Sequence, residues 1–342
     1  MVALRIWVAL SPLLTTALGL GEVGPGLRKH GVVGTGYASY RGIDTYGDVT
    51  SYLGIPYAEP PLGDLRFRAP KALDVARVSR DAGGNIVDAT QYPDFCVQGG
   101  LTREYLMSLP SDAMFTGAGA GGDRGGAGSE DCLKVNIYTP SKARADSGCE
   151  SSPSFHHVDR VLIGPRSLVP VLFYIHGGGF IYGNPANFPF DHWVHQSQDV
   201  VVVSIYYRLA TFGFLSHPNF ADGTIADNNA GFLDQVQALK WVESYISYFG
   251  GDPSKITIDG ESAGGASVLL HLVSTGRKVF KQAISQSLYR GPFPTLDQQK
   301  DLFDYFASQA GCGAGNVTTT IACLRQASVS TLAIAQDATQ GS

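Results

Sequence analysis

The amino-acid sequence predicts an α/β fold, in which helices cover both faces of a mostly parallel central sheet and a small antiparallel part comes first. From residue 170, continuous apolar runs alternate with stretches of helical periodicity, and this alternation is typical of parallel strands buried on both faces. Between residues 31 and 57, glycines alternate with Val, Tyr and Ile, which favours short strands joined by tight turns. With 342 residues and 44% hydrophobic content, the chain is long enough to bury one large core.

The predicted elements follow one another in a regular order. Residues 58–70 are too rich in proline for regular structure and are expected to form a fixed loop. The alternation that follows predicts right-handed crossovers and a ligand site at the carboxyl ends of the strands. The predicted strands are 169–175, 200–207, 255–258 and 282–286, of which the first two are expected to be buried, and the predicted helices are 229–248 and 263–274.

The N-terminus has the pattern of a secretory signal peptide over residues 1–20. Arg5 precedes an apolar run from Ile6 to Leu20, and Ala17 and Gly19 offer small residues for cleavage. A buried first helix or a membrane anchor is the alternative, but the run is shorter than the ~20 residues that span a bilayer. We therefore expect a secreted protein, with one catalytic domain, partial in extent, over residues 21–342 and no stable membrane span.

Two segments interrupt the predicted domain. Residues 115–128 are mostly Gly and Ala, and residues 141–169 are polar and contain Cys149 and the pair His156-His157. We interpret both as irregular insertions; for the second, a metal site is the less favoured alternative, because one Cys and two adjacent His do not have zinc-ligand spacing. The net charge of −5 and the absence of a basic run argue against nucleic acid as a partner, and nothing in the sequence calls for a cofactor.

The pentapeptide Gly-Glu-Ser-Ala-Gly at 260–264 predicts a nucleophilic serine, Ser262. A predicted strand precedes it and a predicted helix follows, which is the context in which Gly-x-Ser-x-Gly exposes its serine on a sharp turn. A serine hydroxyl is a poor nucleophile at neutral pH, so an esterase must present it rigidly to a base and to donors for the oxyanion. An ordinary glycine-rich turn is the alternative interpretation.

A second glycine cluster, His-Gly-Gly-Gly-Phe at 176–180, follows another predicted strand. Three glycines allow backbone N–H groups to point into a cavity, and we expect Gly178, Gly179 and Ala263 to supply the donors of an oxyanion hole. A phosphate-binding loop is disfavoured, because the cluster has neither the Lys-Ser/Thr ending nor the Gly-x-Gly-x-x-Gly spacing.

With these motifs, the chain resembles the type-B carboxylesterase family, which includes cholinesterases and fungal secreted lipases, over residues 31–330. The resemblance implies an α/β-hydrolase fold and a serine acyl-enzyme mechanism that hydrolyses small-molecule or lipid carboxylic esters. The segments that carry it are YLGIPYAEPPLGDLRFR at 52–68, SEDCLKVN at 129–136, HGGGF at 176–180, FLDQ at 232–235 and GGDP at 250–253.

The resemblance also implies specific cross-links. Two disulfides are expected, Cys96–Cys132 and Cys312–Cys323, with Cys149 left over, and two buried ion pairs, Arg66–Glu130 and Arg208–Asp234. Asn316-Val-Thr matches the N-glycosylation acceptor pattern. The sequence departs from the family at Tyr206, where a smaller polar residue is usual, and at Ser287-Leu288, which replaces Ser-Gly.

The other members of a catalytic triad are expected to follow Ser262 in the order acid, then histidine. No glutamate follows Glu261, and His271 is the only later histidine; it lies nine residues along the predicted helix, so we expect a core residue. None of the later aspartates, Asp297, Asp301, Asp304 and Asp337, matches the family's acid. These observations predict an esterase that is incomplete at its C-terminus and feebly active, with a non-catalytic binding protein or an inactive truncated gene product as the alternatives.

Overall fold

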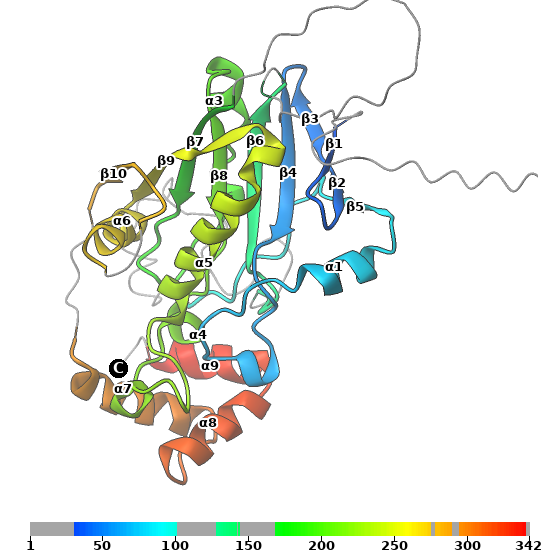
Figure 1. Ribbon diagram of the computed structural model, residues 1–342. Helices are drawn as coiled ribbons and strands as arrows, with labels where there is room; N and C mark the ends of the chain where they lie inside the picture. Colours follow the sequence, from blue (N-terminus) through cyan, green and yellow to red (C-terminus); the bar gives the residue numbers. More distant parts are fainter. Residues whose placement is uncertain are drawn as a thin grey trace, which may run out of the picture.

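The computed structural model describes residues 31–100, 128–141, 143, 168–274, 278–288 and 294–339, and it has a central mixed sheet with helices on both faces (Figure 1). The order of the seven strands across this sheet is β10-β9-β7-β8-β6-β4-β3. Its strands are β3 (Ile43–Tyr46), β4 (Val49–Pro56), β6 (Lys134–Pro140), β7 (Val169–Ile175), β8 (Val201–Ile205), β9 (Gly251–Glu261) and β10 (Gln282–Gln286).

The sheet has a parallel part, as the sequence predicts, and an antiparallel part that includes the predicted N-terminal strands. β7 pairs in parallel with both β8 and β9, and β9 pairs in parallel with β10. β6 pairs antiparallel with β8 and with β4, and β3 pairs antiparallel with β4. A separate small sheet is formed by β1 (Val32–Gly34), β2 (Ser39–Arg41) and β5 (Ile86–Asp88).

Alternate strand residues face two different cores, because successive side chains of a strand point to opposite faces. Val171, Phe173 and Val203 pack in the same core cluster as Trp241 of α5 (Ala230–Tyr245) and Val268 of α6 (Ala263–Val273). The strand residues between them, whose side chains point to the opposite face of the sheet, pack with Val194 of α3 (Asp191–Gln196). The sheet is therefore covered on one face by α5 and α6 and on the other by α3.

A helical layer lies at the end of the sheet where β7 leads into the glycine cluster (Figure 1). It consists of α4 (Ala210–Phe214), α7 (Leu296–Gln309), α8 (Val317–Gln326) and α9 (Val329–Thr339), which pack around a third core cluster. The remaining helices among the described residues are α1 (Val75–Ala82) and the 3₁₀ turns Gly63–Leu65, Pro185–Asn187, Pro218–Phe220 and Ile246–Phe249.

Both predicted disulfides and both predicted ion pairs are confirmed. Cys96 bonds to Cys132, and Cys312, in the loop between α7 and α8, bonds to Cys323 of α8. Arg66 contacts Glu130 at 2.6 Å, and Arg208 contacts Asp234 at 2.6 Å, with all four side chains buried. Arg66 Nη1 also donates to the carbonyls of Leu324, Arg325 and Ala327, so the ion pair caps the C-terminus of α8.

The predicted elements are confirmed with shifted ends. The strand predicted over 255–258 starts earlier, at Gly251, because Gly251 already pairs with Val169 of β7. The helix predicted over 229–248 ends at Tyr245, where a 3₁₀ turn takes over. β10 lies at the edge of the sheet, and all five of its residues are exposed.

The predicted signal peptide lies outside the described residues, as do Cys149, His156 and His157. Of the two predicted insertions, the structure describes only Gly128 and residues 141, 143, 168 and 169. No helix in the described parts of the chain combines the length and the apolar character that a membrane span requires.

Candidate active site

Ser262 lies on the turn that joins β9 to α6, as its motif predicts. Its backbone has φ 56° and ψ −116°, a conformation that residues with a side chain rarely adopt and that costs roughly 1–3 kcal/mol. Its N–H donates to the carbonyl of Gln286 at 3.0 Å, and its carbonyl accepts from the N–H of Ala266 at 2.9 Å. The strained residue is therefore held by the neighbouring strand on one side and by its own helix on the other.

The two glycines of the pentapeptide make this turn possible. A Cβ atom on Gly260 would lie 2.4 Å from the carbonyl carbon of Gly264. A Cβ atom on Gly264 would lie 2.0 Å from the carbonyl oxygen of Ile175, at the end of β7. Any larger residue at either position would push the helix away from the sheet, so both glycines are required for packing.

The glycine cluster lies directly against this turn. A Cβ atom on Gly177 would be 3.0 Å from the Cβ atom of Ser262 and 2.6 Å from the carbonyl oxygen of Glu261. The structure thus brings together two motifs that are more than 80 positions apart in the sequence, since β7 and β9 are neighbouring parallel strands.

The three predicted oxyanion donors are available for a ligand. Gly178 and Gly179 have φ of 112° and 62°, which only glycine adopts without strain. Their N–H groups and that of Ala263, the first residue of α6, have no acceptor among the described residues. Unpaired N–H groups at a helix N-terminus and in a glycine loop can together stabilise a developing oxyanion.

His176 supports the glycine loop from beneath. Its Nδ1–H donates to the carbonyl of Gly177 at 2.8 Å, and its ring stacks on Tyr207, whose hydroxyl donates to the His176 carbonyl. Burial lowers the pKa of His176 to about 4, so the ring is neutral at pH 7. His176 is therefore a support for the loop and is unsuited to act as a base towards Ser262.

Gln98 holds the far end of the same loop, and the sequence alone did not reveal it. Its Oε1 accepts from the N–H of Gly183 at 2.7 Å, and its Nε2 donates to the carbonyls of Cys96 and Gly183. Its own carbonyl accepts from Gln336 of α9, which also binds Thr211 of α4. A chain of buried amides thus ties the glycine loop to the Cys96–Cys132 disulfide and to the helical layer.

The one histidine and the aspartates that follow Ser262 in the sequence lie away from its hydroxyl. His271 is buried in α6, where its Nε2 contacts Gln235 at 3.2 Å, and this confirms the expected core position. Asp297, Asp301 and Asp304 belong to α7, and Asp337 of α9 accepts from the N–H of Gly100. No described residue hydrogen-bonds to the Ser262 hydroxyl.

Comparison with known proteins agrees with this geometry. A model of the carboxylesterase family matches residues 30–342. The chain is 34% identical to acetylcholinesterase of Bungarus fasciatus over 309 residues, which cover 88% of this chain and 44% of that protein. It is also 34% identical to Lipase 2 of Diutina rugosa over 311 residues, covering 85% of this chain and 50% of that one.

A solved structure gives the same result. The crystal structure of Aspergillus niger EstA matches with a TM-score of 0.69 and 31% identity, over 89% of this chain and 50% of that chain. The protein thus spans about half the length of these relatives. On the family match and these identities, the chain belongs to the carboxylesterase family and has its α/β-hydrolase fold.

Proposed function

We propose that the protein hydrolyses carboxylic esters through an acyl-enzyme formed on Ser262. The hydroxyl of Ser262 attacks the ester carbonyl, the N–H groups of Gly178, Gly179 and Ala263 bind the oxyanion, and the alcohol leaves. Water then releases the acid. The observation that carries the proposal is the strained backbone of Ser262 directly against a glycine loop with unpaired N–H groups.

The base is the part of this mechanism that we do not assign to a described residue. His176 is buried beneath the glycine loop, His271 of α6 is buried against Gln235 of α5, and His217 packs against Phe303 of α7. We infer that the base and its acid come from outside the described residues. Without them, the oxyanion hole alone would give only a slow reaction.

The proposal extends to the compartment. A secreted enzyme is supported by the predicted signal peptide over residues 1–20 and by the two disulfides, which persist in oxidising compartments. Asn316 is exposed at the start of α8, where a glycan would project into solvent. Loss of apparent mass on glycosidase treatment of the secreted protein, absent in Asn316→Gln, tests the glycan.

The experiment for the reaction compares the purified protein with Ser262→Ala in hydrolysis of p-nitrophenyl acetate. We expect release of p-nitrophenol that depends on Ser262, and trapping of an acetyl group on the peptide containing Ser262 by mass spectrometry. Equal rates in the two proteins, with no acylated peptide, would refute the proposal. Adding imidazole should raise the Ser262-dependent rate if the preparation lacks its base.

A further inference from the structure

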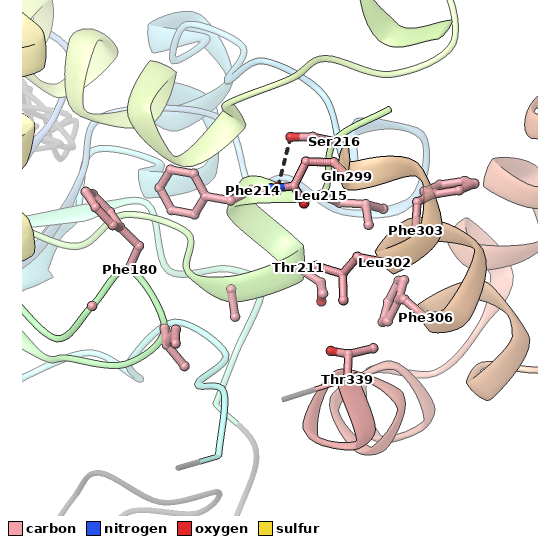
Figure 2. Close-up of a pocket in the computed structure, with 13 residues that line it drawn as sticks. Phe180, Thr211, Phe214, Leu215, Ser216, Gln299, Leu302, Phe303, Phe306 and Thr339 are labelled. Atoms are coloured by element: carbon pink, nitrogen blue, oxygen red, sulfur yellow. Dashed lines mark hydrogen bonds between the residues drawn. The ribbon is translucent and has the colours of Figure 1, made fainter. Parts of the chain in front are cut away.

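Helix α4 borders two cavities of very different size. The larger, of about 270 Å³, lies between the glycine loop and α7, and Figure 2 shows Phe180 and Phe214 in its wall. The smaller has a volume of about 10 Å³ and is lined by Leu209, Phe212 and residues of the two buried ion pairs. The smaller cavity is therefore separate from the glycine loop and belongs to the interior of the fold.

The wall of the small cavity combines polar and apolar groups. Arg208, Glu130 and Ser129 contribute the polar groups, and the other lining residues are Val97, Cys132, Leu209 and Phe212. All of these residues except Ser129 are buried. A molecule held in this cavity is therefore largely shielded from bulk solvent.

Arg208 brings a donor without a partner to this cavity. Its Nε and Nη2 donate to the two carboxylate oxygens of Asp234, at 2.8 and 2.6 Å, so the planar guanidinium turns Nη1 away from that carboxylate. Nη1 is buried and has no hydrogen-bond partner among the described residues. Leaving such a group unpaired is costly, and the great majority of buried polar groups in proteins bind either another protein group or an ordered water.

Glu130 brings spare acceptors to the same cavity. Each of its two carboxylate oxygens accepts one bond from Arg66, at 2.6 Å, and a carboxylate has about four acceptor sites in all. Ser129 Oγ accepts from the N–H of Asp131 at 3.1 Å and still has its own hydrogen to donate. The cavity thus has a charged donor, a charged acceptor and a hydroxyl in its wall.

We propose that the small cavity binds one water molecule, which accepts from Arg208 Nη1 and donates to the Glu130 carboxylate. The cavity volume is close to the ~10–15 Å³ that one buried water needs, which leaves no room for a larger ligand. Arg208 disfavours a cation and Glu130 disfavours an anion, so a neutral molecule that both donates and accepts fits the two charges. Ser129 can supply a third bond, and a buried water typically makes about three.

This water connects two ion pairs that hold different parts of the fold. The Arg66–Glu130 pair holds the C-terminus of α8, because Arg66 Nη1 also donates to the last carbonyls of that helix. The Arg208–Asp234 pair joins α5 to the residues that lead into α4. Through the water, the four charges form one buried network between the helical layer and a helix that covers the sheet.

Crystal structures of the protein grown with and without sodium bromide test the assignment directly. We expect one electron-density peak without anomalous signal, within ~2.7–3.2 Å of both Arg208 Nη1 and a Glu130 carboxylate oxygen. A cavity without density, or an anomalous bromide peak in it, would overturn the proposal.

A measurement in solution uses two matched substitutions. Val97→Ile adds one carbon in the wall of the cavity and competes with the water for its space, whereas Val194→Ile makes the same change at a buried valine of α3 that does not line the cavity. Relaxation dispersion of water oxygen-17 counts the water molecules that stay long in the protein. We expect Val97→Ile to hold one such water fewer than the unaltered protein and Val194→Ile to hold the same number.

Equal counts in the two variants contradict the proposal, whether or not both differ from the unaltered protein. Circular dichroism checks that each variant is folded before its waters are counted. If Val97→Ile does not fold, the crystal structures of the unaltered protein decide the point, since they need no substitution.

Discussion

Gly177 is so close to Ser262 that a Cβ atom on the glycine would lie 3.0 Å from the Cβ atom of the serine. The same atom would lie 2.6 Å from the carbonyl oxygen of Glu261, which belongs to the backbone of β9 and cannot rotate away. The distance between the predicted nucleophile and the predicted oxyanion donors is therefore fixed by backbone contact between the two loops.

Gly177→Ala should consequently separate the two loops. We expect Ser262-dependent ester hydrolysis to fall by about 100-fold or more, because removing one well-placed oxyanion donor costs on that order. Gly47→Ala is the matched control: Gly47 lies in the turn between β3 and β4, and a Cβ atom on it would meet nothing within 4 Å. Steady-state rates of both variants decide the point, and an active Gly177→Ala would show that the loops can shift apart without loss.

The amide chain from Gln98 to Gln336 leads to a second prediction. Gln98→Met removes the hydrogen bonds to Gly183 and Cys96 while keeping the length of the side chain, and leaves the part-buried N–H of Gly183 unpaired. We expect the free energy of unfolding to fall by about 1–3 kcal/mol. We also expect kcat to fall with little change in KM, because the loop positions the oxyanion donors and does not bind the rest of the substrate.

Gln98→Glu keeps an acceptor for Gly183 and should recover part of the loss in kcat. Gln282→Met, at an exposed position of β10, provides the control. Urea denaturation and steady-state kinetics measure the two effects separately. A loss of stability with unchanged kcat would mean that Gln98 supports the fold without positioning the loop.

Local sequence predicted the turn at Ser262 and strand 169–175 well, because each depends on neighbours in the chain: glycines two positions from the serine, and an unbroken apolar run. It did not reveal Gln98 and Gln336, which are hydrogen-bonded partners 238 positions apart, since an isolated glutamine has no periodicity or spacing that marks its partner. It also placed the start of β9 too late, because Gly-Asp-Pro-Ser at 251–254 has the composition of a turn and pairing with β7 overrides that preference. The exposure of β10 likewise depends on which elements pack beside it, and the residues of β10 alone do not reveal those neighbours.

The buried ion pair of Arg208 and Asp234 should be sensitive to loss of one partner. Asp234 is fully buried and accepts from the backbone N–H, Nε and Nη2 of Arg208. Asp234→Ala leaves the guanidinium buried without its counter-charge, so we expect stability to fall by about 3–5 kcal/mol. Asp304→Ala breaks the exposed pair with Lys300 on α7 and should have little effect. Thermal or urea unfolding compares the two, and equal losses would contradict this account.

Two buried histidines should make the fold sensitive to mild acid. Burial lowers the pKa of His176 to about 4, and burial together with the nearby charge of Lys278 lowers that of His271 to about 4. An unfolded histidine has a pKa of about 6.5. Above pH 6.5 the two histidines are neutral in both the folded and the unfolded protein, and the free energy of unfolding has its full value. Below it only the unfolded chain takes up protons, so the free energy of unfolding falls by about 1.4 kcal/mol per pH unit for each histidine until the pH nears 4.

Variants can assign this acid sensitivity to the two side chains. His176→Asn keeps a donor near the position of Nδ1, which binds the carbonyl of Gly177, and His271→Gln keeps one near the position of Nε2, which contacts Gln235. Neither replacement takes up a proton. Each should therefore reduce the decrease in the free energy of unfolding, measured with urea between pH 6.5 and 4.5, by about the contribution of one histidine. His192→Asn is the control, because this side chain is 48% exposed on α3. If His192→Asn reduces the pH dependence of the unfolding free energy as much as His176→Asn and His271→Gln do, then burial is not the cause of the acid sensitivity. If only the two buried variants reduce it, the neutral ring of His176 beneath the glycine loop is part of what holds the loop against Ser262 at neutral pH.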